Sequence, residues 1–149
     1  MEETINAPWL KSYGDVKFHL DYPEGSLAEV VLQTADKYPL QTALSCMGTH
    51  IKYLKFKQKI LDAAKAYQSL GLKPGDKVTV CMPNLPQTVY SLYALNYIGV
   101  IASFIHPMSA VSEIAFYLTE VGSKTVLTLD SFYNKLLEVQ KLVKIDKII

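Results

Sequence analysis

The sequence has almost no net charge and very little cysteine. Its 15 basic and 14 acidic residues leave a formal charge of +1. Nucleic acids and anionic membranes are bound by basic patches or stripes, so we expect no nucleic-acid partner. Cys46 and Cys81 are far apart, and no CxxC pair or secretory signal is present. This pattern argues against a disulfide scaffold and predicts two buried, unreactive thiols in a cytoplasmic protein.

Charged residues are missing altogether between Val78 and Ser112. An uncharged run of this length raises the alternative of a transmembrane helix. However, prolines stand at both ends of the run, polar residues interrupt it, and its period changes from helical to strand-like at "VIASFI", residues 100–105. A strand, helix and strand buried on both faces explain the missing charges equally well. We therefore predict no integral membrane segment.

Motifs for nucleotide, metal and nucleophile sites are also lacking. The chain has no GxGxxG fingerprint, no HExxH and no GxSxG, and His19, His50 and His106 stand apart from one another. Ser45 and Ser103 fall within expected strands, where we expect their hydroxyls to be buried. Five carboxylates fall at expected helix ends or solvent faces, where we expect them to be solvated: Asp36, Asp62, Asp76, Glu113 and Glu120. The sequence thus predicts no catalytic, cofactor-binding or metal-binding residue in this chain.

One stretch, "GLKPGDKVTVCMPN" from Gly71 to Asn84, superficially resembles a phosphate loop. A Walker loop follows a strand and ends in lysine and a hydroxyl residue, whereas this stretch follows a helix, precedes a strand, and has Val78 after Lys77. Pro74 and Gly75 match the central positions of a type II turn. We interpret the stretch as a turn between a helix and a strand.

What is present is a regular alternation of elements. Half of the residues are hydrophobic, which is typical of a globular chain. Residues 1–25 read as an irregular arm, which we expect Trp9 to anchor on the body; residues 26–149 read as the folded part. Ser26 and Glu29 have the spacing of a capping box. A β-hairpin is expected around Gly48-Thr49.

Further along, strand-like and helical segments follow one another at short spacing. Such alternation predicts an α/β fold with a mostly parallel sheet and helices on both faces, preceded by the arm, a helix and the β-hairpin. The expected segments are a helix at 55–70, a strand at 77–82, a helix at 86–98, a strand at 99–105, a helix at 111–121, a strand at 124–129, a helix at 132–141 and a strand at 147–149.

The segment "FIHPMSA", Phe104 to Ala110, follows what we expect to be a central strand of this sheet. Open α/β sheets bind ligands at the carboxyl ends of their strands, so His106 is the best-placed polar residue of the chain. A turn with Pro107 and a cap at Ser109 explains the same residues. We favour the turn, because one residue does not make a site.

The chain closes on "KIDKII", two isoleucines into an expected buried strand. This ending predicts an N-terminal part of a longer polypeptide, although a short strand at a sheet edge would also fit. In the first case the partner is the remainder of the same polypeptide. An unpaired strand edge would also predict a homo-oligomer of the isolated chain.

Four segments follow one another along the chain: "PWLKSY", "YPEGSLAEVVLQTADKYPLQTAL", "IKYLKFKQKILDAAKAYQSLGLKPGDKVTVCMPN" and "LNYIGVIASFIHP". Together they resemble the adenylate-forming superfamily, and most closely its fatty acyl-CoA ligases. The resemblance covers about Pro8 to Leu129 and implies an acyl-CoA ligase that uses ATP, magnesium and coenzyme A through an acyl-adenylate. It implies too that the phosphate loop, the magnesium glutamate, the ribose aspartate and the catalytic lysine lie outside these residues, so that the chain alone is inactive. A non-catalytic interaction module and a peptide synthetase adenylation domain are the alternatives.

Overall fold

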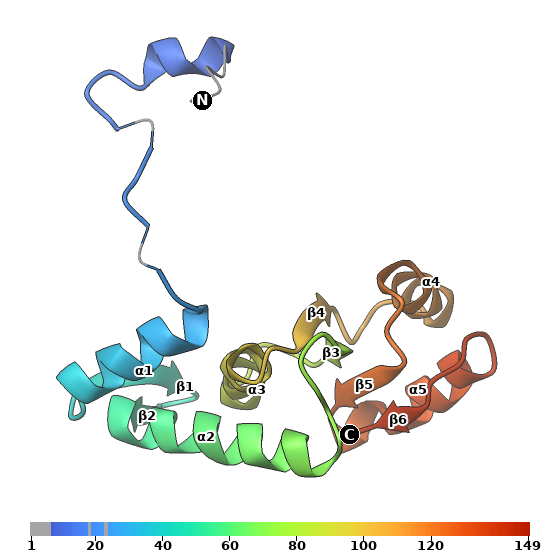
Figure 1. The fold of residues 1–149 in the computed structure, drawn as a ribbon. Coiled ribbons are helices and arrows are strands. Elements are labelled where there is room, and N and C mark those ends of the chain that lie inside the picture. Colours follow the sequence, from blue (N-terminus) through green and yellow to red (C-terminus); the bar gives the residue numbers. More distant parts are fainter. Residues whose placement is uncertain (1–6, 18, 23) are drawn as a thin grey trace.

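The computed structural model describes residues 7–17, 19–22 and 24–149. Its helices and strands follow the predicted order (Figure 1). They are η1 Pro8–Ser12, α1 Leu27–Lys37, β1 Thr42–Cys46, β2 Thr49–Lys52, α2 Tyr53–Ser69, β3 Lys77–Cys81, α3 Pro86–Tyr97, β4 Ile101–Ile105, α4 Val111–Val121, β5 Thr125–Thr128, η2 Asp130–Phe132, α5 Tyr133–Gln140 and β6 Lys147–Ile148.

The main sheet has four parallel strands in the order β4-β3-β5-β6. β1 and β2 form a separate antiparallel hairpin. The parallel sheet and the hairpin were both predicted, and both are confirmed. The prediction that the strand before His106 is central is wrong, because β4 lies at an edge and the central strands are β3 and β5. Strand order depends on packing between distant segments, which alternation along the chain does not encode.

Helices cover both faces of the sheet, as predicted (Figure 1). One core cluster joins α2 and α3 to Val78 and Val80 of β3. The other joins α4 and α5 to Cys81 and Val126. Val78 and Val80 alternate with Thr79 and Cys81 along β3, so successive side chains enter opposite cores. Full burial of an aliphatic side chain stabilises the fold by about 1.5–3 kcal/mol, so the two clusters hold the helices on the sheet.

The capping box at α1 is confirmed. The N–H of Glu29 donates to Ser26 Oγ at 3.2 Å, and the N–H of Ser26 donates to Glu29 Oε2 at 2.6 Å. These reciprocal bonds satisfy N–H groups that have no partner within a helix. The first turn of α1 is therefore determined by residues three positions apart, which is why the sequence could predict it.

Two local predictions need small corrections. The hairpin loop consists of Met47 and Gly48, which have φ angles of 48° and 77°, and Thr49 already belongs to β2. Two positive φ angles are typical of a type I′ turn. α2 begins at Tyr53 instead of Lys55. The N–H of Tyr53, which has no partner within the helix, donates at 3.0 Å to Gln41 O just before β1.

The N-terminal segment leads away from the body (Figure 1). Trp9, in η1, is 61% exposed, so the prediction that it anchors the arm is wrong. Part of the predicted arm, residues 1–6, 18 and 23, lies outside the described residues. Among the helices that the structure describes, none is long and apolar enough to cross a bilayer.

Candidate functional site

The glycine and lysine stretch after α2 forms the predicted turn. Gly71 ends α2 with φ of 88°, and Gly75 has φ of 86°. The N–H of Asp76 donates to Lys73 O at 3.0 Å, closing a four-residue turn, and the Asp76 carboxylate accepts from the N–H of Lys73 at 2.8 Å. A positive φ at the third turn position is what a type II turn requires. The turn leads into the amino end of β3.

Lys77, the lysine of this stretch, is directed at a helix end. Its Nζ donates to Val121 O at 2.8 Å, at the C-terminus of α4. Lys147 donates in the same way to Leu70 O at the end of α2. A helix C-terminus carries unpaired carbonyls and partial negative charge, so a lysine placed there is stabilising. These two ammonium groups serve the fold at the amino edge of the sheet.

A hollow of about 480 Å³ lies at this amino edge. Besides Lys77 and Lys147, it is lined by Lys124 and by the carboxylates of Asp76 and Asp146. Opposite charges are mixed there, and the neighbouring helices present C-termini instead of N-termini. A triphosphate requires convergent N–H donors and positive charge, so the hollow does not fit ATP.

At the opposite, carboxyl edge, a lysine fixes the loop that follows β4. Lys135 of α5 donates through Nζ to Pro107 O at 2.8 Å and to Ser109 O at 3.1 Å. His106 Nδ1 accepts from the N–H of Met108 at 3.2 Å. The N–H of Ser109 donates to His106 O at 3.1 Å, so the predicted turn at this loop is confirmed. The predicted cap at Ser109 is wrong, because the N-cap of α4 is Ala110.

Sequence reasoning did not find Lys135. The bonds join it to residues 28 and 26 positions earlier, and only the approach of α5 to the end of β4 brings them together. A lysine on a helix normally reads as a solvated charge. In the structure Lys135 is half-buried, and its ammonium group is hydrogen-bonded to the backbone of this loop.

Cys81, the last residue of β3, is buried, as predicted. Burial raises the pKa of its thiol, and the positive charge of Lys135 opposes that rise in part. The thiolate is the nucleophilic form of cysteine, so a raised pKa makes Cys81 a poor nucleophile at neutral pH. Its carbonyl accepts the Thr128 hydroxyl at 2.9 Å, which joins β3 to β5 at the carboxyl edge.

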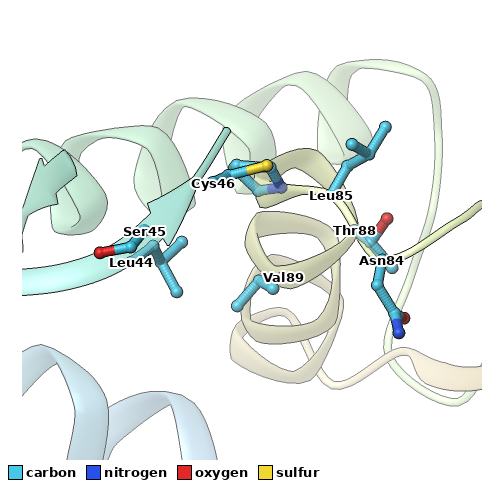
Figure 2. A pocket seen from close by; sticks show the side chains of 8 residues that line it. Leu44, Ser45, Cys46, Asn84, Leu85, Thr88 and Val89 are labelled. Carbon is cyan, nitrogen blue, oxygen red and sulfur yellow. The ribbon is translucent and has the colours of Figure 1, made fainter. Parts of the chain in front are cut away.

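A pocket of about 200 Å³ lies between the hairpin and the start of α3, where Asn84 to Val89 approach β1 (Figure 2). Cys46 is one of its lining residues and is only half-buried, so its predicted burial is wrong. Ser45 is exposed instead of buried, and its Oγ lies 2.8 Å from His50 Nδ1. The wall is mainly aliphatic, so the pocket suits a small apolar group.

The carboxylates singled out in the sequence lie at helix ends or on solvent-exposed faces, as predicted. Asp36 pairs with Lys57 at 2.5 Å, Asp62 accepts from Gln58 at 2.9 Å, and Glu113 accepts from a backbone N–H at the start of α4. Within the described residues, no three His, Cys, Asp or Glu side chains are placed to hold a metal ion.

Comparisons with known proteins agree with this architecture. Residues 31–149 match the AMP-binding enzyme family. A long-chain-fatty-acid–CoA ligase of Bacillus subtilis is 30% identical over 143 residues, which are 95% of this chain and 26% of that protein. The crystal structure of a long-chain-fatty-acid-CoA ligase from Archaeoglobus fulgidus has a TM-score of 0.80 at 23% identity, over 87% of this chain and 28% of that chain. A Mycobacterium tuberculosis fatty acyl CoA synthetase has a TM-score of 0.76 at 21% identity, over 83% of this chain and 26% of that one.

Proposed function

Because this chain belongs to the AMP-binding enzyme family, we propose that it is the N-terminal α/β part of an ATP-dependent acyl-CoA ligase. The observation that carries the proposal is the match of residues 31–149 to the family, together with its likeness to a long-chain-fatty-acid–CoA ligase over 95% of its length. The chain spans about a quarter of the length of that relative. The activity therefore belongs, in this proposal, to a longer polypeptide.

The proposed reaction joins a carboxylic acid to coenzyme A and converts ATP to AMP and pyrophosphate. A carboxylate is a poor electrophile, and an acyl-adenylate supplies AMP as a good leaving group. ATP, magnesium and coenzyme A are the implied cofactors of the whole enzyme. The hollow at the amino edge does not suit the nucleotide, because its Lys77 and Lys147 are bonded to helix carbonyls.

In this proposal the chain contributes structure to the enzyme. Residues 26–149 supply one sheet with its two helix layers, and residues 1–25 are an arm that precedes them. The loop after β4 and the pocket beside Asn84 form part of the wall at the carboxyl edge, where open α/β sheets bind ligands. Lys135 acts as a positioning residue, because it holds the backbone of that loop. We place the enzyme in the cytoplasm, because the two cysteines of this chain are far apart in the sequence and form no CxxC pair.

A chimera tests the proposal. This chain would replace the matching first quarter of the Bacillus subtilis ligase, and fatty-acid-dependent release of pyrophosphate would be measured. We expect activity in the chimera and none in the isolated chain. The matched control carries Leu95→Asp, which places a carboxylate in the core at a side chain with 0% exposure and should abolish folding. A folded chimera that releases no pyrophosphate with any fatty acid would contradict the proposal.

A further inference from the structure

β4 is the exposed edge of the main sheet. It pairs only with β3, while its other side has no strand among the described residues. Ile101 is 51% exposed and Phe104 is 45% exposed, although both belong to an apolar strand. Sheet edges are normally protected by charged side chains, prolines or very short strands. β4 has five residues and none of these protections, because no charged residue occurs between Val78 and Ser112.

The opposite edge differs in each of these respects. β6 has only two residues, and one of them is Lys147. Lys144 and Asp146 stand next to it and pair with each other at 3.1 Å. Short length and charge are the usual means of preventing edge-to-edge association. The two edges of one sheet are thus unequal, and β4 is the edge open to pairing.

Alternation along β4 decides which backbone groups are free. The N–H of Ile101 donates at 2.8 Å to Asp76 O, on the β3 side. Since the direction of the N–H and C=O groups alternates from residue to residue, Ser103 and Ile105 also face β3. The N–H and C=O groups of Ala102 and Phe104 therefore point to the open edge.

The free N–H and C=O groups of Ala102 and Phe104 can bond to the same groups of a second β4 strand. We propose that β4 pairs antiparallel with β4 of a second copy of this chain. In a symmetric register Ser103 lies opposite Ser103 of the second copy. Ala102 then lies opposite Phe104 of the second copy, and each such pair exchanges two hydrogen bonds. The four free groups of each strand are all satisfied in this register, and no charges are brought together.

The side chains fit the same register. Ala102 and Phe104 lie on the α3 face of the sheet, because their β3 partners Val78 and Val80 belong to the α2 and α3 core. On that face a groove of about 410 Å³ follows the edge, and its lining includes Leu27, Leu92 and Ala102. Phe104 of the second copy, opposite Ala102, lies over this groove and covers it. A large side chain thus meets a small one twice across the two-fold axis.

Mass measurements of the 149-residue chain test the pairing. We expect a reversible dimer by analytical ultracentrifugation in the micromolar range, because two short strands cover less than the ~1,600 Å² of a standard interface. Its dissociation constant should change little with salt, since no ion pair is formed. Phe104→Lys should raise the constant about tenfold or more. Phe116→Lys, at a 58% exposed residue of α4, should leave it unchanged, and both variants should keep the circular dichroism spectrum of the parent.

Disulfide trapping tests the register itself. Opposed residues of a non-hydrogen-bonded antiparallel pair have Cα atoms about 4.5 Å apart, within the range of a disulfide. In a Cys46→Ser background, Ser103→Cys should therefore cross-link two copies on oxidation. Ile101→Cys should not, because it lies opposite Ile105. A chain that stays monomeric with freely exchanging Ala102 and Phe104 amides would overturn the proposal, as would a dimer in which Ser103→Cys does not cross-link. A chimera that is active yet monomeric would support the proposed function and refute only this pairing.

Discussion

Thr79 provides a direct test of the central packing of the sheet. It lies in the middle of β3 between β4 and β5, and the residue is 1% exposed. Its Oγ1 has no hydrogen-bond partner among the residues that the structure describes. An unpaired buried hydroxyl costs about 1–3 kcal/mol, so the change Thr79→Val, which keeps the shape of the side chain, should stabilise the fold.

The magnitude follows from two contributions of the same sign. Removing the unpaired hydroxyl recovers most of that cost, and the added methyl group contributes up to about 0.8 kcal/mol of apolar burial. We expect Thr79→Val to raise the free energy of unfolding by about 1–3 kcal/mol. For a domain of this size each kcal/mol corresponds to about 2–4 °C in the melting temperature. Urea denaturation followed by circular dichroism measures the change.

Thr128→Val is the matched control. Its Oγ1 donates to Cys81 O at 2.9 Å, so the same substitution removes a hydrogen bond and should destabilise the chain by about 1 kcal/mol. If Thr79→Val also lowered the free energy of unfolding, the Thr79 hydroxyl would have a partner, such as a buried water molecule. That result would contradict an unpaired hydroxyl in the sheet interior.

Three further substitution or labelling experiments follow from the geometry. Tyr67→Phe removes the 2.7 Å hydrogen bond to Ser91 and should lower the free energy of unfolding by about 1 kcal/mol. Burial raises the pKa of Tyr67 in the folded chain, so the parent should lose stability above about pH 10, where tyrosine ionises in the unfolded chain. The free energy of unfolding of Tyr67→Phe should fall less over the same pH range. Gly71→Ala places a side chain at φ of 88° in open space, so strain alone should lower the free energy of unfolding by about 1–2 kcal/mol in denaturation curves. Iodoacetamide followed by mass spectrometry should label half-buried Cys46 before Cys81, whose burial raises its pKa, and preferential labelling of Cys81 would contradict the buried site.

Features determined by neighbouring residues could be predicted from the sequence. The capping box of Ser26 and Glu29 and the turn at Pro74 and Gly75 each depend on residues within four positions, and both occur as expected. The alternation of strands and helices likewise predicted the parallel sheet and its two covered faces.

Features determined by distant residues could not be predicted. The edge position of β4, the earlier start of α2 and the exposure of Trp9 all depend on which segments meet in space. The same holds at the carboxyl edge. His106 could be predicted as a candidate because it follows a strand. Lys135 could not, because it reaches the loop after β4 only through the packing of α5 against that loop.

The central claim is that these residues are part of a nucleotide-using enzyme whose nucleotide site lies outside them. Calorimetric titration with magnesium and ATP tests it most directly, with the isolated chain and the Bacillus subtilis chimera measured side by side. We expect saturable, magnesium-dependent binding by the chimera and no binding heat from the isolated chain. Tight, magnesium-dependent binding by the isolated chain would contradict it.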